Sequence, residues 1–285
     1  MSKRIKHVKP PKDEDLPFFA YGIFKPNQIA YSKIIKYVKS YYEKEIEFKM
    51  LMRDGVPLIV HQKNNNHKTK GYLICFNNSD DSKKAYEIIS KNEPEKLYKW
   101  EKIQICEMEC NVLMGNNPEL GSSNLESKIG DYNGLNDPFF KEVIEIIEEE
   151  IKNNNNKWHD VHGFFKLQMN YMLLWASIER YCSLKYNAQK IWEKRKQLAG
   201  EEIFKESLGK YVQTERKVYS AEDLKEYTLN AKKPEASINY YYTIRCNVTH
   251  RGKSLFNDRK MLEQSLEELL NIFKDVLKDT FNNNE

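Results

Sequence analysis

Two different hydrophobic periods divide the chain near residue 113. Before that point, short runs of alternating, β-branched or aromatic residues stand between turn residues, a pattern typical of β-strands. After it, apolar residues recur every three or four positions, which is typical of amphipathic helices. The sequence therefore predicts an α+β protein, with a β-rich N-terminal part followed by an all-α helical bundle.

The N-terminal pattern predicts strands separated by turns and two helices. We expect strands at 16–21, 47–52, 57–61, 71–76 and 99–110. Arg53-Asp54-Gly55 is a hairpin-type turn between the second and the third of them. Amphipathic helices are predicted at 29–42 and 82–92.

The C-terminal pattern predicts helices to the end of the chain. Residues 115–134 are rich in Gly, Asn and Ser, which indicates a linker. We expect helices at 137–153, 161–186, 201–211, 221–230, 237–250 and 258–281. The resulting division is a disordered basic tail over 1–15, a first domain over 16–112, a linker over 113–135 and a helical domain over 136–285.

Composition and charge narrow the class of protein. Of the 285 residues, 31% are charged and 40% hydrophobic, a soluble globular balance, and no apolar run approaches the ~20 residues that span a membrane. Five scattered cysteines and the lack of an apolar leader favour the cytoplasm, and no cluster has the spacing of metal ligands. Residues 1–112 carry 21 Lys+Arg against 15 Asp+Glu, whereas the remainder carries 25 against 27. A basic surface that binds nucleic acid can therefore cover only a local part of the protein.

The first chemical motif is the strand-and-loop sequence that contains Tyr21, Gly22, Ile23 and Phe24. Together with segments 55–60, 69–74 and 85–98, it resembles the γ-glutamylcyclotransferase (AIG2-like) family over about ninety residues. The resemblance implies that the loop gathers a substrate carboxylate, that Glu93 is the acid/base group, and that the ligand is a small γ-glutamyl compound. The alternative for Glu93 is a solvated residue at a helix end.

The second motif is Arg245 and His250, five positions apart in a late helix. An imidazole can move protons near neutral pH, and a guanidinium can hold a phosphate and its growing charge. With the segment 175–181, the pair resembles the R-x4-H ribonucleases of the HEPN family over about 140 residues. Alternatively, His250 caps the helix and Arg245 pairs with Glu179 or another acid.

The HEPN resemblance implies RNA as the partner and no metal or cofactor. Asn247 and Glu179 would assist the catalytic pair, and Arg251 and Lys253 would bind RNA. Positions five apart on a helix diverge by about 140° and rise about 7.5 Å, so one copy cannot close the pair on a phosphate. A homodimer joined through the helical domain is therefore expected.

Three functions follow from these residues. The leading one is a metal-independent endoribonuclease of the toxin or antiphage-defence kind, with the N-terminal domain as a sensor or regulator. The alternative is a cyclotransferase-type enzyme acting on a small γ-glutamyl substrate, in which the helical domain only dimerises the chain. In the third, both domains are non-catalytic binding modules.

Overall fold

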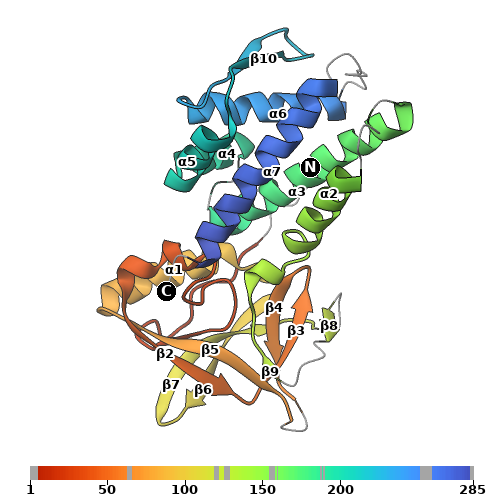
Figure 1. Ribbon diagram of the computed structural model, residues 1–285. Coiled ribbons are helices and arrows are strands. Elements are labelled where there is room, and N and C mark those ends of the chain that lie inside the picture. Colours follow the sequence, from red (N-terminus) through yellow and green to blue (C-terminus); the bar gives the residue numbers. More distant parts are fainter. Residues whose placement is uncertain are drawn as a thin grey trace. The chain divides into compact units, whose positions relative to one another are not determined.

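The computed structural model describes residues 6–62, 66–118, 122–124, 129–153, 158, 160–186, 188, 190–250 and 259–282. The chain divides into two compact units, Met1–Asp137 and Pro138–Asn283. Figure 1 shows the large sheet in the first unit and the long helices in the second. The predicted mixture of helices and strands is thus confirmed, and each unit is described by itself.

A six-stranded sheet forms the frame of the first unit. Five strands follow the order β2 (Val38–Ile46), β5 (Lys68–Phe76), β1 (Phe18–Ala20), β7 (Met108–Gly115) and β6 (Tyr98–Ile105), and β9 (Ile129–Gly130) pairs with β5. The central strand β1 is antiparallel to β5 and parallel to β7. A second sheet has the order β4 (Val56–Val60), β3 (Lys49–Arg53) and β8 (Ser122–Asn124).

Close backbone approach and a buried aromatic cluster hold this sheet together. A Cβ on Gly71 would lie 2.6 Å from the carbonyl oxygen of Ala20, so the β1–β5 contact requires glycine there. On α1 (Ser79–Asn92), the fully buried ring of Tyr86 meets Phe18 and Trp100 edge to face. These contacts fix α1 against the sheet.

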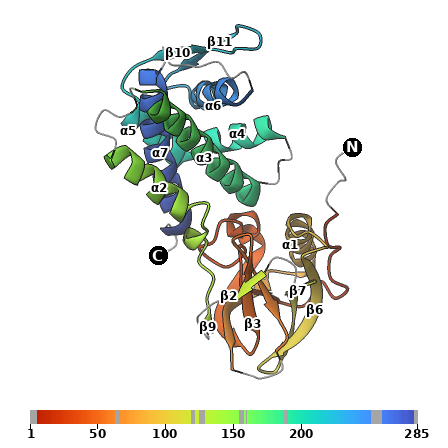
Figure 2. The same ribbon diagram turned by 90° about the vertical axis from the view of Figure 1, so that its right-hand side faces the viewer.

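The second unit is a helical bundle that carries one small hairpin. Its elements are α2 (Lys141–Asn153), α3 (Val161–Lys185), α4 (Ile191–Gly200), α5 (Glu202–Tyr211), β10 (Arg216–Tyr219), β11 (Glu226–Leu229), α6 (Pro234–His250) and α7 (Arg259–Asn282). Helix α7 packs on α3 and α5, while α6 packs on α4 and on the hairpin, which Figure 2 shows beside α6. Aromatic rings of Phe140, Tyr181 and Phe273 meet edge to face in the core.

Two predicted helices are wrong. The segment 29–42 forms two single 3-10 turns, η1 (Tyr31–Lys33) and η2 (Ile35–Tyr37), and then enters β2. The apolar residues there have a spacing that a strand also allows. Pairing with β5 decides that the second part of the segment is a strand and not a helix. The segment 221–230 forms the turn and second strand of the β10–β11 hairpin, with Leu224 at a φ of 56°.

One strand was expected as a single run and one helix was not expected. The run 99–110 is two strands, β6 and β7, joined by a tight turn at Cys106, whose φ is 56°. Helix α4 buries little besides Leu198 and Ala199, so its apolar pattern is too sparse to predict a helix.

Both terminal segments of the first unit belong to its fold. Within the expected disordered tail, residues 6–15 are bonded to the unit: the amide of Val8 donates to Glu93 O, and the amide of Glu95 donates to Lys6 O. Residues 1–5 lie outside the described residues. The expected linker instead completes β7 and adds β8 and β9, because these short strands pair with β3 and β5. The boundary between the units falls after Asp137.

Candidate functional sites

Glu93 terminates helix α1 inside the first unit. The helix begins at Asn78, whose side chain accepts from the amide of Asp81 at 2.9 Å, and it ends where Glu93 leaves the helical conformation. The backbone amide of Glu93 bonds Ser90 O, and its carbonyl accepts from Val8. Burial raises the pKa of Glu93 to about 8, while the charge of Lys33 acts in the opposite direction. The carboxyl group is therefore buried rather than solvated, unlike an ordinary helix-end glutamate.

Two buried tyrosines lie within electrostatic reach of Glu93. Tyr21 donates its hydroxyl to the carbonyl of Leu113 at 2.6 Å, and Tyr98 donates to the carbonyl of Pro57 at 2.8 Å. Burial first, and then the charge of Glu93, raise the pKa of both phenols. Each hydroxyl therefore stays protonated at neutral pH. Because its proton is already used, it offers only an acceptor to a further group.

Lys33 is the cation whose charge lowers the pKa of Glu93. Its Nζ donates to Asn92 Oδ1 at 2.6 Å, next to Glu93 in the chain. Burial lowers the pKa of Lys33 to about 8, and the charge of Glu93 partly opposes this shift. A buried acid and a buried base with similar pKa values can exchange a proton at small cost.

The loop after β1 lies close to β4 and leaves backbone donors unused. A Cβ on Gly22 would lie 3.0 Å from the ring of Pro57, so the approach is tight at this position. Gly22 O accepts from Lys25, and Ile23 O accepts from Ala30, which closes the loop. Among the described residues, no hydrogen bond is made by the backbone N–H groups of Gly22, Ile23 and Phe24. Successive unused amides of this kind suit an anion.

The chemistry of this cluster, formed by the loop 21–24 with Lys33, Glu93 and Tyr98, suits an amino acid head group. The loop amides can hold a carboxylate, and Glu93 with the phenolic oxygens can accept from an ammonium. The predicted members Tyr21 and Glu93 are therefore brought together across the sequence. Ile23 and Phe24 contribute backbone only, because their side chains belong to the core.

Arg245 stands on α6 and faces α3. Its guanidinium Nη2 lies 3.5 Å from Glu179 Oε1, and its Cζ lies 5.7 Å from the centre of the Tyr242 ring. Both partners of the ion pair are largely shielded, with 18% and 33% of their side chains exposed. The pairing with Glu179 is the contact that both interpretations of Arg245 expected.

The side chain of Asn247 is bonded to the backbone of the hairpin. Its Oδ1 accepts from the amide of Ala221 and its Nδ2 donates to the carbonyl of Tyr219, each at 2.8 Å. The side chain is buried and its amide is engaged with the hairpin backbone. Two positions along a helix point about 200° apart, which directs Asn247 away from the Arg245 face.

His250 is the last residue of α6, and its side chain lies outside the described residues. Arg251 and Lys253 also lie outside them. The structure thus places Arg245, Glu179 and Asn247, and the remaining members of the predicted ribonuclease site stay predictions.

Three further features of the described residues bear on these sites. Within the described part of the chain, no three His, Cys, Asp or Glu side chains come together as a metal site. Tyr240 and Tyr241 are core residues, whereas Tyr242 is half-buried and contacts two arginines. Among the described helices, none has the length and apolar character to cross a bilayer.

Comparisons with known proteins give no assignment: no family model matches the chain, and no curated protein and no solved structure matches it.

Sequence reasoning missed Lys33 and Arg195 as members of polar sites. Lys33 was placed on a regular helix, which hid its proximity to the end of α1. Arg195 is half-buried on α4, a helix that the apolar pattern does not predict. The sequence did indicate Tyr98, because it is the last residue of the segment 85–98 that resembles the γ-glutamylcyclotransferase family.

Proposed function

We propose that the first unit is a cyclotransferase-type enzyme that acts on a small γ-glutamyl compound. One observation carries the proposal: a buried Glu93 with its pKa raised to about 8 shares a site with Tyr21 and a loop of unused backbone amides. The positions are those that the family resemblance names. No cofactor is needed for the reaction.

The reaction follows from the donors and acceptors of the site. The substrate α-carboxylate would bind the amides of Gly22, Ile23 and Phe24, and its α-ammonium would face Glu93. Glu93 takes a proton from the ammonium, and the freed amine attacks the γ-carbonyl carbon. A new C–N bond closes the five-membered ring while the old amide C–N bond breaks. Glu93 returns its proton to the leaving nitrogen, and the ring nitrogen passes its second proton to the released amine, so 5-oxoproline and an ammonium product are released.

The test is formation of 5-oxoproline by the purified full chain from γ-glutamyl dipeptides and γ-glutamylamines, followed by liquid chromatography. Glu93→Gln keeps the shape of the side chain and removes its base, and we expect a loss of at least about a hundredfold in kcat. Glu95→Gln is the matched control, because Glu95 is exposed and makes backbone contacts only. Equal turnover by the Glu93→Gln variant would contradict the proposal.

A second function, for the helical unit, is a metal-independent endoribonuclease. The observation that favours it is the position of Arg245 on the last turns of α6. There it contacts Glu179 of α3 and the ring of Tyr242. Arg245 would stabilise the charge on the phosphorane, His250 would transfer protons, and Glu179 would orient the guanidinium. Arg251 and Lys253 would contact the RNA backbone. A toxin or defence effector would use such an activity.

Cleavage of labelled RNA in excess EDTA tests this second function. We expect fragments with 2′,3′-cyclic phosphate ends, loss of cleavage in His250→Ala, and normal cleavage in His162→Ala. His162 is exposed near the start of α3 and is not one of the residues that define the site. Strict dependence on Mg²⁺, or full activity of His250→Ala, would reject the mechanism.

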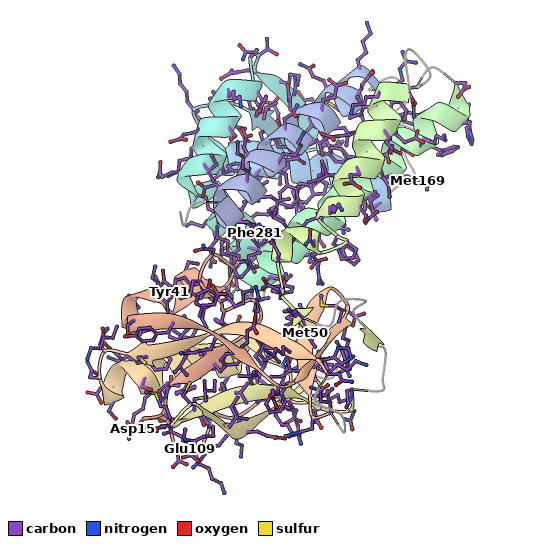
Figure 3. All side chains as sticks on the ribbon, turned by 60° about the horizontal axis from the view of Figure 1, so that its bottom comes forward. Asp15, Tyr41, Met50, Glu109, Met169 and Phe281 are labelled. Atoms are coloured by element: carbon purple, nitrogen blue, oxygen red, sulfur yellow. The ribbon has the colours of Figure 1, made fainter. Side chains whose placement is uncertain are left out.

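A second copy of the chain is the partner that this ribonuclease site would need. An apolar groove of about 870 Å³ runs between α2 and α3 and reaches Val248 on α6. Phe165 and Met169 on its rim are 57% and 70% exposed, and Figure 3 labels Met169 on α3. Because the exposed rim lies beside the groove, it suits a two-fold contact in which the rim of each copy fills the groove of the other. That contact would bring two α6 ends together.

A further inference from the structure

A second cavity opens in the helical unit, on the side of α6 that carries Tyr242 and Cys246. It has a volume of about 560 Å³ and is bounded by α4, by the turn of the β10–β11 hairpin and by α6. This volume lies within the range of small-molecule sites and is too small for a folded partner. Of the residues named for the two proposed reactions, Tyr242, which contacts Arg245, is the one that lines it.

Arg195 gives the cavity its strongest recognition group. Its Nε donates to Asn239 Oδ1 at 3.1 Å, and its Cζ lies 3.7 Å from the centre of the Tyr242 ring. The guanidinium is therefore held in one position by a hydrogen bond and a stacking contact. Nη1 is buried and has no hydrogen-bond partner among the described residues.

A guanidinium that is held in one position at the wall of a cavity favours an anion. A carboxylate or phosphate oxygen accepts charge-assisted hydrogen bonds from such a group. Lys196, which follows Arg195 on α4, also lines the cavity and adds positive charge there.

Aromatic surface is available next to this anion position. Trp192 precedes Arg195 by one helical turn, lines the cavity and keeps 53% of its surface exposed. Tyr227 of β11 lines the cavity as well. An exposed tryptophan beside a fixed arginine suits a planar ring attached to an anionic group.

The hairpin turn supplies the third element. Glu222 and Asp223 line the cavity with Ser220. The pKa of Asp223 is lowered, chiefly by a hydrogen bond from Ser220, so its carboxylate stays ionised near neutral pH. Carboxylates next to an aromatic surface are acceptors for hydroxyl groups. A ligand with an anion, a planar ring and hydroxyls matches all three elements.

We propose that this cavity binds a nucleotide. The phosphate lies on Arg195 with Lys196, the base stacks on Trp192, and the ribose hydroxyls face the carboxylates of the hairpin turn. The same chemistry is present in a free mononucleotide and in one unit of a single RNA strand. The test measures binding and not turnover, so its outcome does not depend on either reaction proposed above.

The test is isothermal titration calorimetry of the full chain with AMP, CMP, GMP and UMP. Adenosine and inorganic phosphate are the fragment probes, and each should bind at least about tenfold more weakly than the best mononucleotide. Arg195→Met should weaken that mononucleotide by at least about tenfold, and Trp192→Ala by at least about threefold. Lys205→Met is the control, because Lys205 lies on α5 and does not line the cavity.

Trp192→Ala also guards against loss of folding in Arg195→Met, because the Trp192 side chain is largely exposed. A competing single-stranded oligonucleotide distinguishes the source: tighter binding than the mononucleotide assigns the site to RNA, and weaker binding assigns it to a free nucleotide. The proposal is overturned if none of the four mononucleotides binds at millimolar concentration. It is equally overturned if Trp192→Ala binds them as the unaltered protein does.

Discussion

Asn247 on α6 donates to the backbone carbonyl of Tyr219 on β10 at 2.8 Å. The same side chain accepts from the amide of Ala221 at 2.8 Å, so one buried amide holds the start of the hairpin turn at two points. Since that turn forms a wall of the nucleotide cavity, Asn247 links the stability of the hairpin to the shape of the cavity.

Replacing Asn247 by Ala should destabilise the helical unit by about 1–3 kcal/mol, because two backbone groups lose their partners. Urea denaturation followed by far-UV circular dichroism measures the change in midpoint. Asn271→Ala on α7 is the matched control and should stay within about 0.5 kcal/mol. An unchanged midpoint for Asn247→Ala would show that the hairpin is held by other contacts.

Most of the regular elements follow from hydrophobic period alone. Residues 79–92, 161–185 and 259–282 carry long apolar stripes with clear ends, and they were predicted as helices to within a few residues. The failures occur where strand pairing overrides the local pattern: β2 and the β10–β11 hairpin owe their form to pairing with other strands, which no local pattern records.

Of the sites, the sequence could name the residues but not their surroundings. Glu93 and the loop 21–24 were linked only by resemblance, and burial decides that the carboxyl group is not solvated. The environment of Glu93 depends on Lys33 and Tyr98, which reach it from other parts of the chain. Asn247 is a second case, because its partner in the hairpin cannot be inferred from the spacing of residues on α6.

Glu93 should make the first unit less stable as pH rises. Its pKa in the folded state is about 8, against 4.5 for an unperturbed glutamate, so the folded state holds the proton more tightly. Stability from this group is complete below pH 4.5 and is lost as pH rises towards 8. The loss is on the order of a few kcal/mol. Lys33, with its lowered pKa, contributes in the opposite direction and only above pH 8.

The measurement is chemical denaturation of the unaltered chain and of Glu93→Gln across this pH range. The glutamine cannot ionise, so the variant should keep its stability where the unaltered protein loses it. Parallel curves for the two proteins between pH 5 and 8 would mean that Glu93 is not buried in solution.

The cyclotransferase reaction should share the same titration. Attack by the amine requires the Glu93 carboxylate, so kcat should rise with pH through about 8. Lys33→Met removes the charge that lowers the pKa of Glu93, and the midpoint of the profile should move to higher pH. Lys36→Met, an exposed neighbour on η2, should leave the midpoint in place. A midpoint that stays the same in Lys33→Met would remove Lys33 from the site.

The apolar groove on α2 and α3 should join two copies of the chain. Met169 and Phe165 are exposed, so Met169→Glu and Phe165→Glu should leave the helical unit folded while placing a charge in the contact. We expect each to raise the dimer dissociation constant by at least about tenfold, measured by analytical ultracentrifugation. Met108→Glu is the control, because Met108 is exposed on β7 of the other unit.

The same variants connect the dimer to RNA cleavage. A composite site needs Arg245 and His250 near a two-fold axis, so cleavage should fall in parallel with dimer formation and recover at high protein concentration. Mixing Arg245→Ala with His250→Ala should restore part of the activity, since some mixed dimers then hold one intact Arg and one intact His in a single cleft. Full RNA cleavage by a protein that sediments as a monomer at the assay concentration would exclude the composite site.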